Sequence, residues 1–359
     1  MRTNPTPRFR HPERSEGPLY FALCFCLPLL FTQVATSAHA QPTEPPTVHI
    51  GVLSLFHPQT LVLTSTQPLT LTLDAHTLTL PPNHPATIQS TPEGLTLNTL
   101  EIENQTVQTL TVTPAIFTLT VPAKLTRLYR GSLSITAKSG TLIPIITMPT
   151  ELAVASIVQA ESPPHASLEA LKAQAVVSRS FLLAQRSRHP DFDACDTTHC
   201  QFLRSPPPAH SPASIATRAT RNQVLIWRPT PDAPAQIVPA MYSRSCGGHT
   251  HAHPTSPGAY PFYSVSCSYC LRHPELWSRT RPATTPQTEA ERLAFNRTHG
   301  WSAIPSNTHS LSGDTLAGRG AGHGIGLCQL GANDLAAHAA GYEKIVAHFF
   351  PNTTLSTLK

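Results

Sequence analysis

Alternation of apolar and polar residues is the feature that most restricts how this chain can fold. Residues 69–80 (LTLTLDAHTLTL) and 99–114 (TLEIENQTVQTLTVTP) repeat with a period of two, which is the period of half-buried β-strands. Prolines interrupt the pattern every few residues, as expected between short edge strands. We therefore expect residues 41–125 to form a small β-rich region with a structural or glycan-facing accessory role, since no catalytic constellation is visible in it.

The chain beyond this region has helical patterns as well as strands. Residues 151–160 (ELAVASIVQA) carry an apolar stripe that runs into Pro163 and Pro164, and prolines end helices. Ser167 is suited to cap a second helix that extends to about Arg188. Further helices are expected over residues 213–221, 327–340 and 342–349, strands over 223–227 and 236–243, and mostly loop over 247–310. The prediction is a mixed α+β domain over residues 126–359.

The first 40 residues have the three parts of a secretory signal peptide. Residues 1–18 carry arginines, residues 19–31 (LYFALCFCLPLLF) are apolar, and Ala38-His39-Ala40 is a small-x-small cleavage site. We expect cleavage near Ala40 and a secreted protein that is periplasmic or associated with the cell wall. An uncleaved anchor is the alternative. No later segment is long and apolar enough to span a membrane, so we expect none in the mature chain.

Charge excludes a nucleic-acid binder. The formal net charge is +5, and the four arginines and two glutamates of the first 18 residues account for +2 of it. Charged residues make up only 13% of the chain, and no stretch concentrates basic residues. A nucleic-acid-binding domain carries a clustered basic field. We therefore expect no nucleic-acid partner.

Cysteines outside the leader allow two interpretations. The chain has eight cysteines, of which Cys24 and Cys26 lie in the predicted leader. An even number in an oxidising compartment favours disulfides. The other cysteines include Cys195-x4-Cys200 and Cys267-x2-Cys270, spacings that also suit zinc, and His189 and His199 lie close to the first pair. A Cys195–Cys200 disulfide, pairing of these two with Cys267 and Cys270, and an all-thiolate zinc site built from both pairs all stay open.

Four motifs stand out in the second part of the chain. They are Glu161-Ser162-Pro163 with EALKAQAVVSR (169–179), CDTTHCQ (195–201), YSRSCGGHT (242–250) and GRGAGHGIGLCQLGA (318–332). In this order and at these distances they resemble the SpoIID/LytB family of secreted proteins that act on peptidoglycan. The resemblance covers roughly residues 125–355, and it implies a mixed α+β domain with a glycan-binding groove.

The resemblance implies two different activities. Sporulation members of the family are lytic transglycosylases, which cleave between N-acetylmuramic acid and N-acetylglucosamine and leave 1,6-anhydro ends. Other members are amidase enhancers, for which a non-catalytic role in binding peptidoglycan and localising or stimulating a cell-wall amidase was proposed. Glu161 occupies the position of the catalytic glutamate of the sporulation members, which favours the enzyme. One carboxyl group with a raised pKa can serve first as general acid and then as general base.

The same resemblance assigns further residues. Lys172 and Arg179 lie seven residues apart on one helical face and are expected to bind substrate or orient Glu161; their alternative is an ordinary solvated helix surface. The other predicted substrate-binding residues are Tyr242, Ser243, His323 and Gln329. Many family members have Ser where this chain has Cys328, so a hydrogen bond from that hydroxyl would be weaker here.

The resemblance also implies a possible zinc site. Some sporulation members contain zinc held by cysteines and a histidine near CDTTHCQ, which makes His189, Cys195 and Cys200 the leading ligand set, with a disulfide as the competing interpretation. The predicted reaction requires no cofactor, so zinc would be structural. A zinc-dependent hydrolase, in which the metal activates water, is a third and weaker functional hypothesis.

Overall fold

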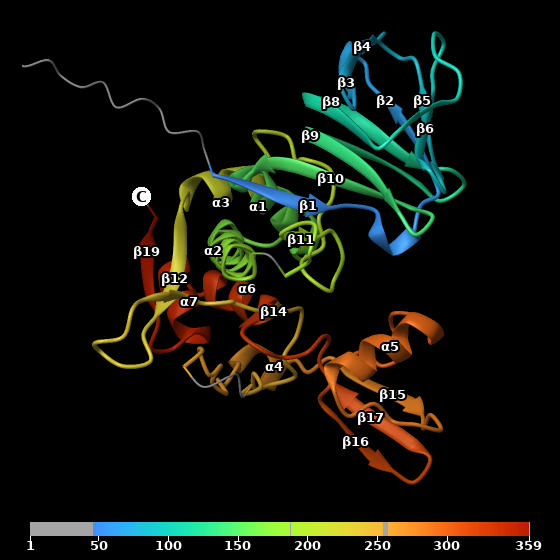
Figure 1. Ribbon diagram of the computed structural model, residues 1–359. Coiled ribbons are helices and arrows are strands. Elements are labelled where there is room, and N and C mark those ends of the chain that lie inside the picture. Colours follow the sequence, from blue (N-terminus) through green and yellow to red (C-terminus); the bar gives the residue numbers. More distant parts are fainter. Residues whose placement is uncertain (1–45, 187, 254–257, 359) are drawn as a thin grey trace, which may run out of the picture. The chain divides into compact units, whose positions relative to one another are not determined.

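The computed structural model describes residues 46–186, 188–253 and 258–358, which form one compact unit with a mixed α+β fold (Figure 1). The predicted signal peptide and its cleavage site near Ala40 lie outside the described residues. Within the part that is described, no helix combines the length and the apolar character needed to cross a membrane.

An eleven-stranded sheet makes up the first half of the described chain. Its main path runs β11-β1-β10-β9-β8-β2-β5-β6-β7, and the hairpin β3–β4 is attached through β3 to β8. The predicted alternation is confirmed in β3, where the side chains of Leu69, Leu71 and Leu73 are buried and the threonines between them are not. In the second predicted stretch, residues 99–104 lie outside the strands. The strands are β1 Thr47–Gly51, β2 Thr60–Thr64, β3 Leu69–Leu73, β4 His76–Leu80, β5 Ala86–Thr91, β6 Gly94–Asn98, β7 Gln105–Val107, β8 Thr109–Val121, β9 Leu125–Lys138, β10 Thr141–Pro149 and β11 Ala194–Cys195.

Strands from both sides of residue 125 pair within this sheet. The long strands β8 and β9 are antiparallel neighbours over most of their length, with an irregularity between Val112 and Ala115. β10 then continues the same sheet and leads directly into the first helix. The division of the chain at residue 125 stays a prediction.

The helices α1 (Thr150–Glu161), α2 (Leu168–Ala184) and α3 (Pro212–Ala219) follow the sheet. As predicted, α1 ends ahead of Pro163, and Glu161 is its last residue. Ser167 caps α2 by accepting a hydrogen bond from the backbone N–H of Ala170. α2 ends at Ala184, short of the expected Arg188.

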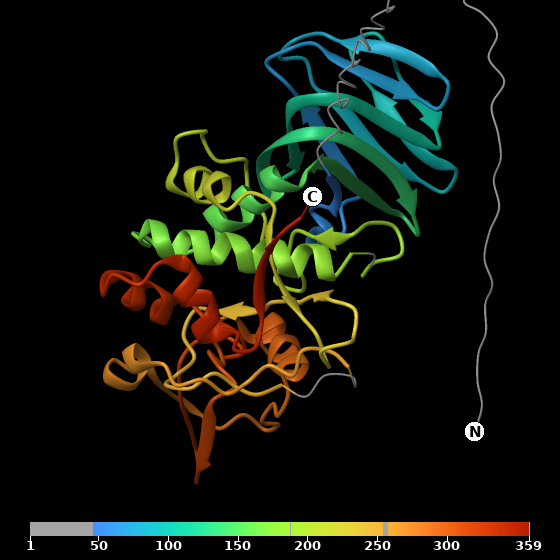
Figure 2. The same ribbon diagram turned by 90° about the vertical axis from the view of Figure 1, so that its left-hand side faces the viewer.

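Helix α2 lies between the large sheet and the C-terminal elements (Figures 1 and 2), and it contributes to a hydrophobic core on each side. On one side, Leu171 and Ala175 join the core of the large sheet. On the other, Ala173 and Val176 join a core with the C-terminal elements α6 (Gln329–Ala337) and α7 (Tyr342–Phe349) and with the small sheet β13-β12-β19. The strands of that sheet are β12 Gln223–Trp227, β13 Gln236–Ile237 and β19 Thr354–Thr357.

The predicted strand 236–243 is two short strands. β13 pairs with β12, whereas β14 (Tyr242–Ser243) lies parallel to β18 (Leu327–Cys328). Pro239 separates them, and proline cannot donate a hydrogen bond to a sheet ladder. Because β18 takes residues 327–328, α6 begins at Gln329 and not at Leu327.

Most of the described residues between 247 and 310 lie outside helices and strands, as expected, but the segment also contains elements that were not predicted. It holds α4 (Ser268–Arg272), β15 (Leu276–Thr280), α5 (Glu289–His299) and the start of β16 (His309–Ser312). β15 and β16 flank β17 (Thr315–Arg319) in a three-stranded sheet. α5 begins with a capping box between Thr288 and Glu291, a local sequence signal that identifies a helix start.

Candidate functional site

A pocket of about 240 Å³ opens where α1 ends, opposite β14 and the start of α6. Its walls come from three separate parts of the chain, so only the folded domain assembles it. The lining residues are Glu161, Ser162, Pro163, Pro164, Tyr242, Ser243, Arg244 and Gln329. Four of the seven predicted catalytic or substrate-binding residues are therefore brought together: Glu161, Tyr242, Ser243 and Gln329.

Glu161 is the only carboxylate among the lining residues. Its Oε1 accepts a hydrogen bond of 2.6 Å from the backbone N–H of Phe202. Burial raises the pKa of this carboxyl group, because the charged form loses hydration; the Phe202 N–H and the Tyr242 hydroxyl act in the opposite direction and only partly offset it. The net effect favours the protonated acid.

Tyr242 joins Glu161 to a set of buried amide side chains. The Tyr242 hydroxyl donates to Gln201 Oε1 at 3.2 Å, and Gln201 Nε2 donates to the backbone oxygen of Ser178 at 3.1 Å. Burial raises the pKa of Tyr242, and the nearby Glu161 carboxylate adds to the rise. Tyr242 therefore stays a neutral hydrogen-bond donor.

Gln329 fixes the end of α1 from the other side. Its Nε2 donates to the backbone oxygen of Glu161 at 2.8 Å and to Gln174 Oε1 at 3.2 Å. Gln174 Nε2 in turn donates to Ser178 Oγ at 3.0 Å. The sequence reasoning did not single out Gln174 or Gln201, although both lie inside the motifs that carried the resemblance. Nothing in a single sequence distinguishes a buried Gln that orients a site from an exposed one.

Two hydroxyl groups in the pocket have no hydrogen-bond partner among the described residues. The Oγ atoms of Ser162 and Ser243 are both buried, and neither is paired. A buried hydroxyl without a partner is costly, so such groups call for an explanation, for example a ligand that satisfies them. Arg244, which the sequence reasoning also missed, supplies the pocket's cation and pairs with Glu275 at 2.7 Å.

The glycine-rich stretch 318–326 allows the wall carrying Gln329 to approach β14. Gly326 has φ +73°, and a Cβ there would collide with the backbone oxygen of Met241. Gly322 has φ +98°, and a Cβ there would lie 2.9 Å from the Cβ of Ser243. The glycines thus serve backbone packing.

His323 is not one of the residues that line the pocket. Its Nδ1 accepts a hydrogen bond of 3.0 Å from the backbone N–H of Ile325. Burial lowers its pKa, since the imidazolium form would lose hydration. The predicted role of His323 in substrate binding stays a prediction.

Lys172 and Arg179 are not brought to Glu161. Arg179 is 1% exposed, and its guanidinium makes a bidentate pair with Glu151 at 2.8 and 2.7 Å. Lys172 Nζ pairs with Glu169 at 2.6 Å. Neither cation lines the pocket. Arg179 joins α2 to α1, and the substrate-binding roles predicted for both residues stay predictions.

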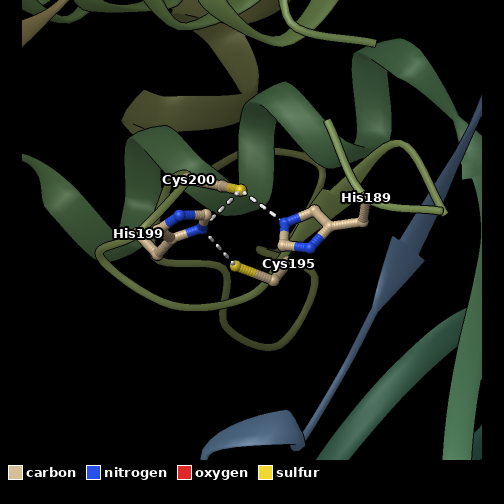
Figure 3. A group of neighbouring side chains, drawn as sticks. All are labelled: His189, Cys195, His199 and Cys200. Atoms are coloured by element: carbon tan, nitrogen blue, oxygen red, sulfur yellow. Dashed lines mark hydrogen bonds between the residues drawn. The ribbon is translucent and has the colours of Figure 1, made fainter. Parts of the chain in front are cut away.

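His189, Cys195, His199 and Cys200 converge in one group, hereafter the His/Cys group (Figure 3). Their ligand atoms all lie within 4.8 Å of one another. His189 Nε2 lies 3.2 Å from Cys200 Sγ, and His199 Nδ1 lies 3.8 Å from Cys195 Sγ and 3.7 Å from Cys200 Sγ. The predicted set His189, Cys195 and Cys200 is thus brought together, and His199 joins it.

The His/Cys group fits zinc. Two thiolates and two imidazoles are a complete tetrahedral ligand set, the composition of structural zinc sites, whereas catalytic sites keep a position open for water. None of the four side chains lines the pocket. The group supports the pocket indirectly, because Gln201 and Phe202, which contact Tyr242 and Glu161, follow Cys200 directly in the chain.

The remaining four cysteines of the described chain form a second group, hereafter the four-cysteine group, and all are buried. Its members are Cys246, Cys267, Cys270 and Cys328. The interpretations that join Cys195 and Cys200 to Cys267 and Cys270 are wrong, because the two pairs fall in separate groups. Cys328, which stands where many SpoIID/LytB proteins have Ser, is thus surrounded by three other cysteines.

Comparison with known proteins gives two matches. Residues 138–227, from the end of β9 to the end of β12, match the family model described as SpoIID, stage II sporulation protein. The matched segment contains Glu161, α2 and the His/Cys group. An uncharacterised protein of Brachyspira hyodysenteriae (strain ATCC 49526 / WA1) is 24% identical over 266 residues, which cover 62% of this chain and 70% of that protein.

Proposed function

We propose, on the basis of the SpoIID-family domain that this chain carries over residues 138–227, that the protein cleaves the glycan strands of peptidoglycan as a lytic transglycosylase. The family includes lytic transglycosylases and points to peptidoglycan as the ligand. One observation carries the finer proposal: Glu161 lies on the wall of a pocket, and burial raises the pKa of its carboxyl group.

Glu161 acts first as a general acid. Its carboxyl proton passes to the glycosidic oxygen, the bond from that oxygen to the anomeric carbon breaks, and positive charge develops on the sugar ring. An acid of this kind must hold its proton at the working pH, which a raised pKa favours. The carboxylate that remains lies beside the oxocarbenium-like sugar and stabilises it.

Glu161 then acts as a general base. The carboxylate takes the proton from the C6 hydroxyl of the same muramic acid, whose oxygen bonds to the anomeric carbon and closes the 1,6-anhydro ring. Proton and charge balance, and the chemistry requires neither an activated water molecule nor a second catalytic carboxylate. A pocket with a single lining carboxylate suits this route.

The other lining residues position the sugar. Ser162 and Ser243 offer hydroxyl groups that have no partner among the described residues of the protein, and sugar hydroxyls would satisfy them. Arg244 offers a guanidinium for a carboxylate such as the lactyl group of muramic acid. The Tyr242 hydroxyl donates to Gln201 and lies beside the Glu161 carboxyl group, whose pKa it lowers, so it helps to hold the acid in place.

The His/Cys group has a supporting part in this proposal. His189, Cys195, His199 and Cys200 would hold a zinc ion that supplies no step of the reaction and fixes the course of the chain up to Gln201 and Phe202. We also propose that the protein works outside the cytoplasm, after cleavage near Ala40, where peptidoglycan is available.

Product analysis tests the proposal. Purified peptidoglycan, with and without its stem peptides, is digested with the wild-type protein and with Glu161→Gln, and the released sugars are identified by mass spectrometry. We expect 1,6-anhydro ends with the wild type and a loss of about 10²–10⁴-fold with Glu161→Gln. Binding to the strands should be equal for the two proteins, since Gln has nearly the same shape as Glu.

Two other results would contradict the proposal in different ways. Reducing ends from the wild type would mean that water is the nucleophile, as in a hydrolase. No cleavage by either protein, with intact strand binding, would instead favour a binding protein that localises or stimulates an amidase. Stimulation of a cell-wall amidase by both proteins would support that second function directly.

A further inference from the structure

The four-cysteine group joins three parts of the chain that are distant in sequence. Cys246 follows β14, Cys267 directly precedes α4, Cys270 lies in the first turn of α4, and Cys328 ends β18. Their exposed fractions are 1%, 2%, 0% and 0%. No other metal-ligating side chain of the described residues belongs to the group. Four thiols have therefore been brought from separate segments into one buried place.

The four sulfur atoms lie close enough together to coordinate one metal ion. All four Sγ atoms lie within 4.8 Å of one another, and each interacts with the other three. Cys270 Sγ and Cys328 Sγ are 3.5 Å apart. Tetrahedral zinc with bonds of about 2.3 Å to sulfur requires sulfur–sulfur separations of about 3.8 Å. Two disulfides would pair the sulfurs two by two, whereas here all four cysteines are free and each sulfur lies within 4.8 Å of the other three.

Neighbouring groups are suited to sulfur that carries negative charge. The backbone N–H of Gly331 donates to Cys328 Sγ at 3.4 Å, in the first turn of α6. Ser245 Oγ lies 3.5 Å from Cys270 Sγ. A Cβ at position 331 would lie 2.5 Å from Cys267 Sγ, so glycine is needed for this close approach. Hydrogen bonds of this kind tune and orient metal ligands.

We propose that Cys246, Cys267, Cys270 and Cys328 bind a structural zinc ion that is distinct from the His/Cys group. Soft thiolate ligands select zinc over magnesium or calcium, and four of them complete its coordination. The ion joins β14, α4, β18 and the start of α6.

The position of this ion connects it to the pocket. Ser243 and Arg244 precede Cys246 on one segment, and Gln329 follows Cys328 on the other. The hydrogen bonds from Leu327 N to Met241 O and from Leu330 N to Arg244 O, of 3.0 and 3.1 Å, join the same two segments. The zinc ion therefore holds the wall of the pocket that faces Glu161. The proposal concerns metal binding, and it can succeed or fail whether or not the protein cleaves glycan.

Metal analysis of matched double variants tests the proposal. The protein is purified without chelators, and its zinc and iron are measured by mass spectrometry for the wild type, for Cys195→Ser with Cys200→Ser, and for Cys267→Ser with Cys270→Ser. We expect the first variant to retain one zinc ion per chain, with four sulfur neighbours at about 2.3 Å by X-ray absorption. The second variant should contain one zinc ion fewer than the wild type.

The proposal would be overturned if Cys267→Ser with Cys270→Ser contained as much zinc as the wild type. It would also be overturned if Cys195→Ser with Cys200→Ser held iron in place of zinc, or zinc with nitrogen or oxygen neighbours. A peptide map of the unreduced wild type keeps the test decisive if a variant fails to fold. Trypsin leaves Cys246, Cys267 and Cys270 in one peptide (245–272) and Cys328 in another (320–344). If the group were disulfide-bonded, these two peptides would be covalently joined. We expect them to separate, with every thiol free to react once the protein is unfolded with a chelator.

Discussion

The two cysteine groups of this protein have similar chemistry and are built in opposite ways. The His/Cys group takes all its members from the short segment between His189 and Cys200, whereas the four-cysteine group takes its members from three segments between Cys246 and Cys328. The first organises a loop. The four-cysteine group joins elements that share few backbone hydrogen bonds, because the paired strands β14 and β18 are only two residues long.

The groups also support different parts of the pocket. Gln201 and Phe202 follow the last member of the His/Cys group in the sequence. Gln201 accepts a hydrogen bond from Tyr242, and the Phe202 N–H donates one to Glu161. Next to the four-cysteine group lie Ser243 and Gln329, on the wall across from the end of α1. We therefore expect the His/Cys group to govern the local geometry near Glu161, and the four-cysteine group to govern whether the opposite wall forms at all.

Removing ligands from the four-cysteine group should have the largest effect. Structural zinc supplies folding free energy, so we expect the double variant Cys267→Ser with Cys270→Ser to lower the melting temperature by about 10 °C and to abolish glycan binding. Thermal unfolding and strand pull-down measure the two effects. An unchanged melting temperature would show that the wall does not depend on this group.

Removing ligands from the His/Cys group should affect activity more than stability. In Cys195→Ser with Cys200→Ser, Gln201 and Phe202 lose their anchor, and displacement of about 1 Å near a reacting group costs about 10²-fold in rate. We expect a fall of this size in anhydro-end formation and a smaller fall in melting temperature than in Cys267→Ser with Cys270→Ser. If this variant proved the less stable of the two, the contrast between the groups would be reversed.

The part of the site that sequence could predict is the local part. The prolines after Glu161 end α1 at that residue, Ser167 caps α2, and the spacing of Cys195 and Cys200 allows a metal site as well as a disulfide. These depend on neighbours within about one or two helical turns. The four-cysteine group could not be predicted in the same way, because its members meet only when α4 and α6 pack together.

Arg179 illustrates the same limit for charges. Its heptad relation to Lys172 places both on one side of α2, yet the partner that decides its environment is Glu151 of α1. Which side of a helix is covered depends on tertiary packing, and α2 is covered on two sides. The capping box of α5, in contrast, was a local signal from which that helix could have been predicted.

A subtler test concerns the unpaired hydroxyl of Ser243, on the same wall of the pocket as the four-cysteine group. Ser243→Ala removes a buried hydroxyl that has no partner among the described residues, and such a group costs free energy, so we expect stability equal to or slightly above that of the wild type. Binding to glycan should weaken about 3–10-fold, the equivalent of one neutral hydrogen bond. Ser90→Ala is the matched control: its hydroxyl is also buried and unpaired, but it lies in β5 of the large sheet. Equal effects of both variants on binding would contradict the assignment.

The smallest predicted effect is a pH-dependent change in stability at Glu161. Burial raises the pKa of this carboxyl group above its ordinary value of 4.5. As pH rises past that value, the unfolded chain loses the proton first, and the folded state loses stability until its own raised pKa is passed. Glu161→Gln has no such proton. It should therefore be more stable than the wild type at pH 7, and the difference should vanish below about pH 4.

Thermal unfolding of both proteins from about pH 3 to about pH 8 measures this difference. A wild type that is as stable as Glu161→Gln at neutral pH would show that the carboxyl group is not destabilised by burial, and the argument for a proton-holding acid would lose its physical basis.

Whether Glu161 is the acid is decided by the rate at which Glu161→Gln forms 1,6-anhydro ends relative to the wild type, with both proteins at equal metal content and equal strand binding. We predict a loss of about 10²-fold or more, since no other residue that lines the pocket carries a carboxyl group to supply the proton. Anhydro ends formed at the wild-type rate by Glu161→Gln would contradict the assignment of the acid and with it the account of this pocket.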